Sequence, residues 1–214
     1  MSVKQVIVVG GGLAGLTSAL HLSRFGIKVI LIEKNSYPRH KVCGEYLSNE
    51  VLPYLRSLSF DPFDFGAKKI EHFELSSVKG KAVKVKLPLG GFSLSRYTLD
   101  QAMLTQAITN GVQVVKDAVL DIKFNNDRFY LTLKETGNLE GTFVIGAFGK
   151  RSNLDQKLKR NFLESKAPYL AVKEHYSVDY PEDLVGLYHF YGGYCGVSKI
   201  ENDLVNICYI AQYD

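Results

Sequence analysis

Features that mark several protein classes are scarce or missing in this sequence. It has no tryptophan and only three cysteines, Cys43, Cys195 and Cys208, which form no CxxC pair, and we expect no signal peptide ahead of its first apolar segment. An odd number of scattered cysteines argues against a disulfide-stabilised secreted protein, so we expect a cytoplasmic protein in a reducing compartment. The histidines show no spacing typical of metal ligands, and we expect no metal.

Long hydrophobic runs and dense charge are absent as well. The apolar run that begins at Val6 is too short and too rich in glycine to span a bilayer, so we expect no transmembrane segment. The net charge is +4, and lysines and arginines are spread along the chain, which argues against a nucleic-acid partner. Hydrophobic residues make up 46% of the 214 residues, so a core can form in one large domain or two small ones.

Residues 6–34 combine a strand, a glycine-rich turn, a helix and a second strand. The run from Val6 to Val9 is β-branched throughout, which is typical of a strand buried on both faces of a parallel sheet. The sequence GGGLAG follows at residues 10–15, and leucines at helical spacing lead to Gly26, where we expect the helix to stop. Residues 29–32 form the next strand, so the segment predicts a βαβ unit.

Each glycine of this GxGxxG pattern has a physical task in a dinucleotide site. Gly10 permits the tight turn, Gly12 lets a pyrophosphate approach the backbone, and Gly15 lets the helix pack close to the strand. The free N–H groups and positive dipole end of the helix, at Leu13 and Ala14, would then bind the pyrophosphate. The alternative is a glycine-rich turn in an unrelated α/β protein.

An acidic residue, Glu33, ends the second strand about 20 positions after Gly12. A carboxylate at that place accepts hydrogen bonds from the ribose hydroxyls of an adenosine. We therefore include Glu33 and the neighbouring Lys34 among the candidate binding residues. A glutamate suits FAD and NAD alike, so this unit alone leaves the dinucleotide open.

Two downstream segments have the pattern of a known flavoprotein family. YPRHKVCGEYLS, residues 37–48, resembles the PRxKxCG segment of the geranylgeranyl reductase family. These are FAD-dependent oxidoreductases of the glutathione-reductase type, related to aromatic-ring hydroxylases and flavin halogenases. SLSRYTLDQAMLTQAITNGVQVV, residues 93–115, resembles the family's R…LD…L…A…GV segment. The resemblance covers about residues 3–155 and, more loosely, residues 188–210.

The resemblance implies roles for several residues of these two segments. Arg39 would lie over the FAD phosphates or ribose, where its guanidinium offers a charged fork to phosphate. Cys43 and Gly44, with Glu45, would lie near the isoalloxazine ring, and Arg96 would contact FAD. The structural alternatives are a buried small hydrophobe for Cys43 and a surface arginine before a helix cap for Arg96.

A third segment both supports the resemblance and departs from it. Val119 matches the family's strand position beside adenine, and GTFVIGAFGKRSNLD, residues 141–155, resembles the vIGADGxxS motif through Ala147 and Gly149. Phe148 stands where the motif has an aspartate that places the ribityl chain and serves the NAD(P)H-binding region. NAD(P)H is thus a candidate electron donor, but the missing carboxylate argues against the usual NAD(P)H mechanism.

Other stretches predict further elements. Residues 67–94 alternate as a hairpin in which Val83 and Val85 oppose Lys84 and Lys86, and the lysines form a solvated face or, alternatively, bind an anionic carrier or lipid headgroup. Thr98 and Gln101 stand three positions apart and predict a capping box for a helix that ends at residues 110–111. Residues 117–135 predict a β-meander with a turn at 125–127.

Together these features predict an α/β fold. A Rossmann-like FAD-binding domain of the glutathione-reductase type would comprise residues 1–66 and 95–153. An inserted, mostly antiparallel β substrate domain would comprise residues 67–94 and 154–214. The family continues into a GDAAG-like segment that this sequence lacks, so we expect a C-terminally truncated chain or a short natural relative, with only part of the substrate domain.

The predicted function is transfer of electrons or hydride through FAD to a small apolar substrate, isoprenoid or polyketide-like. No catalytic acid or base is assigned from the sequence. The alternatives are an FAD-dependent monooxygenase or hydroxylase and a truncated, non-catalytic nucleotide-binding module. The lack of tryptophan excludes a halogenase WxWxIP motif in this sequence. Peripheral contact with a membrane and the oligomeric state stay open.

Overall fold

The computed structural model describes residues 5–150, 152–164 and 168–213, and the chain divides into two compact units. The first unit consists of Met1–Pro38 and Asp100–Lys166, and the second of Arg39–Leu99 and Ala167–Asp214. These units are defined by which residues pack together. The domain bounds expected from the sequence are defined instead by which segments would bind FAD and which would bind substrate. The domain bounds therefore stay a prediction.

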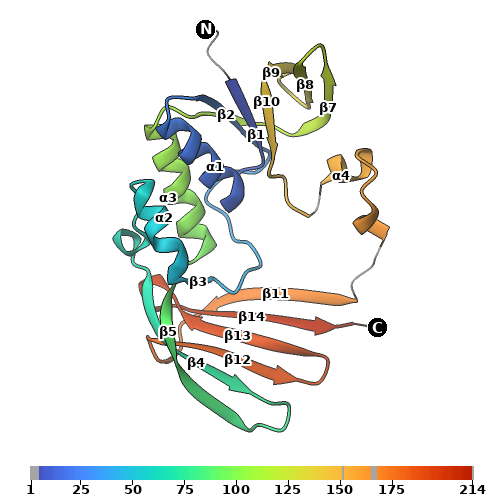
Figure 1. Ribbon diagram of the computed structural model, residues 1–214. Helices are drawn as coiled ribbons and strands as arrows, with labels where there is room; N and C mark the ends of the chain where they lie inside the picture. The colour runs from blue at the N-terminus through green and yellow to red at the C-terminus, as the bar shows by residue number, and fades with distance from the viewer. Residues whose placement is uncertain (1–4, 151, 165–167, 214) are drawn as a thin grey trace. The chain divides into compact units, whose positions relative to one another are not determined.

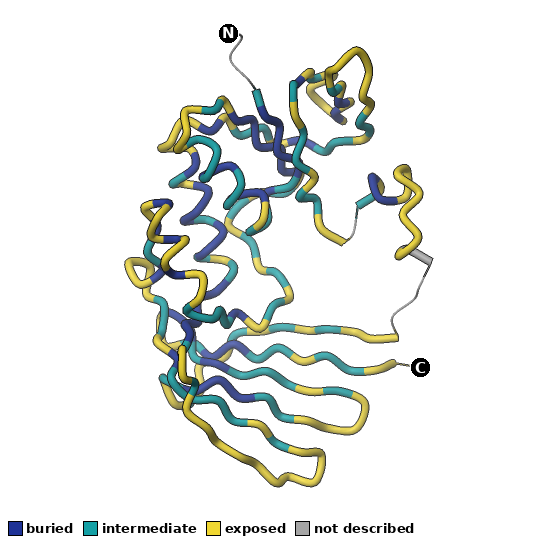
Figure 2. The backbone as a smooth tube through the Cα atoms, in the orientation of Figure 1, coloured by how far each residue is buried: buried dark blue, intermediate teal, exposed yellow. Residues whose placement is uncertain are grey.

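A parallel sheet forms the core of the first unit (Figure 1). β1 pairs in parallel with β2 and β10, so it has a neighbour on each side, and β6 follows β2. Ile7, Val8 and Leu31 are fully buried, and Figure 2 shows β1 and β2 in dark blue. The predicted Rossmann-like core is confirmed. The strands are β1 Gln5–Val9, β2 Lys28–Glu33, β6 Gln113–Lys116 and β10 Phe143–Gly146.

Helix α1, Leu13–Arg24, connects β1 to β2. Its buried residues are Gly15, Leu16, Ala19 and Leu20, which lie on one face of the helix. The helix ends before Gly26, whose φ of 70° is left-handed, as the sequence predicts. Its N-cap is Gly12, its first turn has no acidic residue, and no side chain among the described residues caps it.

A three-stranded antiparallel sheet completes the core of the first unit. It consists of β7 Val119–Asn125, β8 Arg128–Leu133 and β9 Asn138–Gly141. Asn126 and Asp127 both have positive φ, as a tight hairpin turn requires, so the predicted turn is confirmed. The meander extends beyond the predicted residues 117–135, because its third strand is β9. Leu131 and Leu133 pack with Ile7 of β1 in one hydrophobic cluster.

Helix α3, Arg96–Thr109, corrects the capping-box prediction. The helix begins earlier than predicted, and Ser95 is the capping residue: its Oγ accepts a hydrogen bond from the Thr98 N–H at 3.1 Å. Glu201 supplies the carboxylate that a capping box would place three residues into the helix. It accepts from the Ser95 N–H at 2.9 Å, from the Ser95 hydroxyl, and from the Thr98 hydroxyl at 2.6 Å. A distant residue therefore completes the cap.

A seven-stranded sheet forms the second unit, in the order β11-β14-β13-β12-β4-β5-β3. All neighbours pair antiparallel except β12 and β4, so the predicted mostly antiparallel sheet is confirmed. The strands are β3 Tyr46–Ser48, β4 Lys68–Ser76, β5 Ala82–Ser93, β11 Tyr169–Tyr176, β12 Leu184–Phe190, β13 Gly193–Lys199 and β14 Val205–Gln212. Short helices are α2 Leu52–Ser57 in this unit and α4 Asn153–Lys157 in the first.

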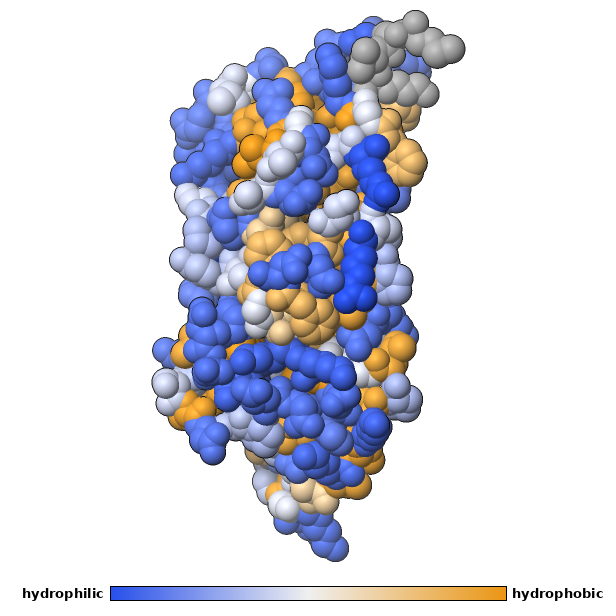
Figure 3. Space-filling view, turned by 90° about the vertical axis from the view of Figure 1, so that its left-hand side faces the viewer, coloured by the Kyte–Doolittle hydropathy of each residue, from blue (hydrophilic) through white to orange (hydrophobic). Residues whose placement is uncertain are grey.

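The outer half of the β4–β5 hairpin is exposed on both faces. Lys84 and Lys86 are solvated as predicted, but Val83 and Val85, on the opposite face, are also 56% and 46% exposed. Figure 2 shows this part of the hairpin in yellow, and the lowest part of Figure 3 shows hydrophilic and apolar side chains interspersed on it. Alternation alone therefore did not predict which face is buried.

Candidate functional site

Backbone atoms crowd the glycine turn between β1 and α1. Gly10 has a φ of 106°, and a Cβ built on it would lie closer than 3.0 Å to the carbonyl oxygen of Ala147. A Cβ on Gly15 would lie equally close to the carbonyl oxygen of Gly10. The turn thus requires glycine at position 10, and the close packing of α1 on β1 requires it at position 15, as the pattern predicts.

Gly12 has a different reason to be glycine. Its φ of −80° and ψ of −176° are extended values that any residue adopts. The conformation alone therefore does not call for glycine. The close approach of a ligand to the backbone at Gly12 therefore stays a prediction.

Gly11, which the GxGxxG pattern leaves unspecified, is held by two side chains. Its N–H donates to Glu33 Oε2 at 2.8 Å, and its carbonyl oxygen accepts from the Tyr37 hydroxyl. A Cβ on Gly11 would overlap that hydroxyl. Glu33 Oε1 also accepts from the backbone and side-chain nitrogens of Asn35, at 2.9 and 2.7 Å. The buried Glu33 carboxylate therefore fixes the turn from the end of β2.

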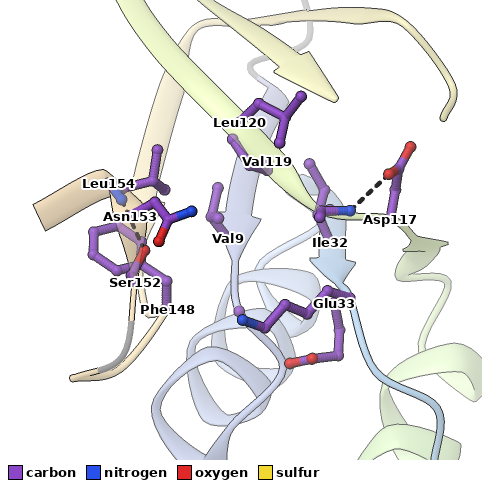
Figure 4. Close-up of a pocket in the computed structure, with 13 residues that line it drawn as sticks. Val9, Ile32, Glu33, Asp117, Val119, Leu120, Phe148, Ser152, Asn153 and Leu154 are labelled. Carbon is purple, nitrogen blue, oxygen red and sulfur yellow. Dashed lines mark hydrogen bonds between the residues drawn. The ribbon is translucent and has the colours of Figure 1, made fainter. Parts of the chain in front are cut away.

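A cavity of about 140 Å³ lies beside this turn, at the carboxyl ends of β1 and β2. Ligands of open parallel sheets bind at this edge. Figure 4 shows Phe148 and Leu154 on one side of Val9 and Glu33 and Asp117 on the other. The cavity is smaller than the roughly 300 Å³ typical of a whole ligand, so it suits one part, such as an adenine. The predicted site residues that line it are Gly10, Glu33, Lys34 and Val119.

The remaining candidates of the first unit lie near the turn but do not line the cavity. The Ala147 N–H donates to the Val9 carbonyl at 2.8 Å, which fixes the end of β10 beside Gly10. Gly149 is exposed with a φ of 72°, and a Cβ there would meet open space. Leu13 and Ala14 form the first turn of α1.

Phe148, the departure from the flavoprotein motif, has an apolar environment. It is half-buried, lines the cavity, and packs against the cluster that contains Val9, Ile32 and Leu154. A carboxylate at this position would be partly desolvated and would share the cavity with Glu33 and Asp117. The phenylalanine is therefore a packing residue here.

Asp117 is a cavity residue that sequence reasoning missed. It is buried, and its carboxylate accepts from the N–H groups of Ala118 at 2.6 Å and Thr136 at 2.8 Å, from the Thr136 hydroxyl at 2.8 Å, and from the Glu135 N–H at 3.1 Å. Burial raises the pKa of Asp117, but the hydrogen bonds from Thr136, Ala118 and Glu135 outweigh it and lower the pKa to about 2. The carboxylate ties the β6–β7 connection to the β8–β9 turn.

Asp117→Asn should destabilise the protein at neutral pH, because an amide nitrogen would face donors. We expect Tm to fall by about 5 °C or more. Because the folded-state pKa lies below the unfolded value of 3.8, the stabilisation from Asp117 is present above about pH 4 and is lost as pH falls towards 2. Denaturant unfolding at pH 6, 4 and 3 should show this loss in the unmutated protein but less of it in Asp117→Asn. Asp127→Asn, in the β7–β8 turn, is the control; the same change there would refute the assignment.

The other predicted residues, Arg39, Cys43, Gly44 and Arg96, lie in the second unit. Asn206 Nδ2 donates to the carbonyl oxygens of Cys43 at 3.3 Å and Gly44 at 3.0 Å. Gly44 is exposed, and a Cβ there would meet open space. The Arg96 N–H donates to Glu45 Oε1 at 2.8 Å, so one carboxylate connects the 43–45 loop to the start of α3.

Two residues beside Glu45 were also missed from the sequence. Lys173 and His175 both contact the Glu45 carboxylate, at 2.8 and 2.7 Å. The signal in the sequence is two polar residues two positions apart in a strand, which places them on one face of β11. A solvated strand face has the same pattern, so the sequence does not show that Glu45 of the 43–45 loop covers these two residues.

Two absences concern the described residues alone. Within 5–150, 152–164 and 168–213, every helix falls short of the length and hydropathy that a membrane span requires. In the same ranges, His, Cys, Asp and Glu side chains form no group of three or more that could hold a metal ion.

Residues 5–42, which contain the glycine turn and Glu33, match the family model described as FAD dependent oxidoreductase. Digeranylgeranylglycerophospholipid reductase 1 of Methanosphaera stadtmanae is 30% identical over 189 residues, which are 84% of this chain and 46% of that protein. The chain is related to the FAD-dependent oxidoreductases. Menaquinone reductase of Mycobacterium tuberculosis is 29% identical over 188 residues, again 84% of this chain and 46% of the relative. The chain therefore spans about half the length of these curated relatives.

Solved structures share the fold. A geranylgeranyl bacteriochlorophyll reductase-like protein of Thermoplasma acidophilum superposes with a TM-score of 0.79 at 22% identity, covering 98% of this chain and 57% of the other. The flavin-dependent brominase Bmp2 gives a TM-score of 0.81 at 18% identity, covering 98% of this chain and 56% of the other. The resemblance that the sequence motifs indicate is confirmed.

Proposed function

We propose that this chain binds FAD and forms the cofactor-binding part of an oxidoreductase that passes electrons or hydride through the flavin to an apolar substrate. The observation that carries the proposal is the meeting of the glycine turn, Glu33, Lys34 and Val119 around one cavity at the carboxyl edge of the parallel sheet. The residues fit the ADP half of FAD. Helix α1 has a glycine N-cap and no acidic residue in its first turn, and β2 ends in the carboxylate of Glu33.

The residues of the chain would bind and orient the cofactor. The N–H groups at the start of α1 would donate to the pyrophosphate, and Glu33 would accept from a ribose hydroxyl while it holds Gly11. Arg39, Cys43, Gly44 and Arg96 are assigned to the rest of the FAD on the family resemblance. The bound FAD would supply the redox chemistry.

The substrate class rests on the relatives. One is named for reducing a digeranylgeranylglycerophospholipid and another for reducing menaquinone. We infer an apolar, isoprenoid-bearing substrate for this chain as well. An oxygenase or halogenase is the second candidate, because flavin-dependent halogenases are also among the relatives.

The test is titration of the purified protein with FAD, followed by flavin absorbance and thermal protection. Stoichiometric binding supports the proposal, and the absence of binding refutes it. After chemical reduction of the bound flavin, slow reoxidation by oxygen without hydroxylated or halogenated product favours a reductase. Fast oxygen consumption with such a product would favour the second candidate.

Glu33 should select against a 2′-phosphorylated nucleotide. Its carboxylate would repel the phosphate and lose the ribose hydrogen bond, so ADP should raise Tm more than 2′-phospho-ADP at equal concentration. We expect a difference in Kd of roughly tenfold or more, which Glu33→Gln should reduce. Glu50→Gln, at an exposed glutamate, is the matched control. Equal protection by the two nucleotides in the unmutated protein would remove Glu33 from this role.

A further inference from the structure

Three ionisable groups of the second unit meet within hydrogen-bond distance of one another. Lys173 Nζ lies 2.8 Å from Glu45 Oε1 and 2.8 Å from His175 Nε2, and His175 Nε2 lies 2.7 Å from Glu45 Oε2. The side chain of Glu45 is fully buried, and those of Lys173 and His175 are 3% and 12% exposed. We call these three residues the Glu45 cluster.

The contacts at His175 Nε2 are compatible with two positions of a proton. If Nε2 carries a hydrogen, it donates to Glu45 Oε2, and the ammonium of Lys173 then faces a second donor. If Nε2 carries none, it accepts from Lys173, and its lone pair faces a carboxylate oxygen at 2.7 Å unless that oxygen is protonated. Each arrangement leaves one contact unsatisfied, so neither position of the proton satisfies all three groups.

An exposed histidine, His40, lies beside the Glu45 cluster. His40 is exposed, and its ring makes an edge contact with His175, at 5.2 Å between centroids, and stacks on Tyr97 at 4.7 Å. Burial, then the charges of Lys173 and His175, lower the pKa of His40, so it is a neutral carrier near pH 7. The charges of Glu45 and, less strongly, Glu201 act against this and raise the pKa of His40. On β14, Cys208 is a titratable group that interacts with Glu45 and Lys173.

One member of the cluster, Glu45, belongs to the 43–45 loop, which we expect at the flavin. The Glu45 N–H donates to Cys43 Sγ at 3.4 Å, and Glu45 itself has a left-handed φ of 56°. The same carboxylate accepts from the N–H of Arg96.

We propose that Glu45, Lys173 and His175 form a proton-holding site that serves the reaction at the 43–45 loop. This inference rests on the proposed function, in which each hydride delivered to a double bond or quinone is matched by one proton. When the proton leaves, the N–H bond at His175 Nε2 breaks and the proton forms the new C–H or O–H bond of the reduced substrate; a proton from solvent, carried by His40, then restores the N–H bond. The electrons come from the reduced flavin, and none come from the cluster.

The site is tested first without FAD, by NMR titration of the histidine rings. Lys173→Met removes a positive charge beside Nε2, so His175 should gain its second proton at a pH about 1 unit or more higher than in the unmutated protein. Glu45→Gln should shift that pH downward, and Lys173→Arg should restore it. His72, 2.7 Å from Asp183 in the same sheet, is the matched control and should not change. An unchanged His175, or an equal change at His72, overturns the proposal.

A second measurement separates this inference from the proposed function. In FAD-loaded protein, the flavin midpoint potential depends on pH. In Lys173→Met, the pH at which this dependence changes slope should shift by the same amount as the His175 titration, relative to the unmutated protein. A protein that binds FAD but shows no such change refutes the use of the proton at the flavin. A protein that binds no FAD refutes the proposed function, while the NMR titration still decides whether the cluster holds the proton. Glu45→Gln leaves Lys173 buried without its anion; if it does not fold, the two lysine variants decide the outcome.

Discussion

Gly12→Val should abolish binding of FAD and ADP while the unliganded protein keeps its fold. The backbone at Gly12 is extended, with φ of −80° and ψ of −176°, and valine favours that region. The new side chain would instead occupy the space that a pyrophosphate needs above the start of α1. We expect Kd to rise about 100-fold or more, and the loss of a glycine N-cap to cost at most about 1 kcal/mol.

Gly12→Ser is the informative partner of this variant. Serine is a better N-cap than glycine, so its hydroxyl should accept from the α1 N–H groups and stabilise the unliganded protein by a few tenths of a kcal/mol. Those N–H groups are the ones that we assign to the pyrophosphate, so FAD binding should weaken at the same time. Calorimetric titration and thermal unfolding measure the two effects separately. Unchanged FAD affinity in both variants would place the cofactor elsewhere.

The sequence predicts well those features that depend on neighbours in the chain. The βαβ unit, with a turn at Gly10 and a close approach at Gly15, follows from residues 6–34, because the turn, the helix and both strands are local. The meander and its turn at residues 126–127 are local in the same sense. Such features need only the spacing of glycines, apolar residues and turn residues.

Features formed by distant residues could not be predicted in this way. The sequence predicts a cap at Thr98, but Ser95 caps α3 together with Glu201, which lies 106 positions from Ser95. The Glu45 carboxylate meets Lys173 and His175 across 128 and 130 positions. Local patterning cannot distinguish such buried polar residues from solvated ones, because both alternate with apolar residues along a strand.

The glycine turn shows the same limit within the predicted site. Gly11 is unspecified in GxGxxG, yet the Tyr37 hydroxyl occupies the place of a side chain there. Glu33 was expected to contact a ribose, and the structure shows that it also fixes the turn through the Gly11 N–H. Mutation of Glu33 therefore affects nucleotide binding and turn geometry together, whereas the comparison of ADP with 2′-phospho-ADP in the unmutated protein leaves the turn intact.

Gly15→Ala should destabilise the protein severely, although helix propensity alone predicts the opposite. In an ordinary helix interior, alanine is about 1 kcal/mol more favourable than glycine. At Gly15 the new Cβ would lie closer than 3.0 Å to the carbonyl oxygen of Gly10, which is backbone at the end of β1 and cannot rotate away. Relief requires α1 to move off the central strand of the sheet.

Because α1 buries Leu16, Ala19 and Leu20, this movement would open the core of the first unit. We expect a loss of about 4–5 kcal/mol, a large part of the 5–15 kcal/mol that stabilises a typical domain. Ser18→Ala, on the same helix, is the matched control and should leave the free energy of unfolding unchanged or slightly higher. Urea unfolding of the two variants decides the matter: a Gly15→Ala protein as stable as Ser18→Ala would show that α1 does not need glycine to pack on β1.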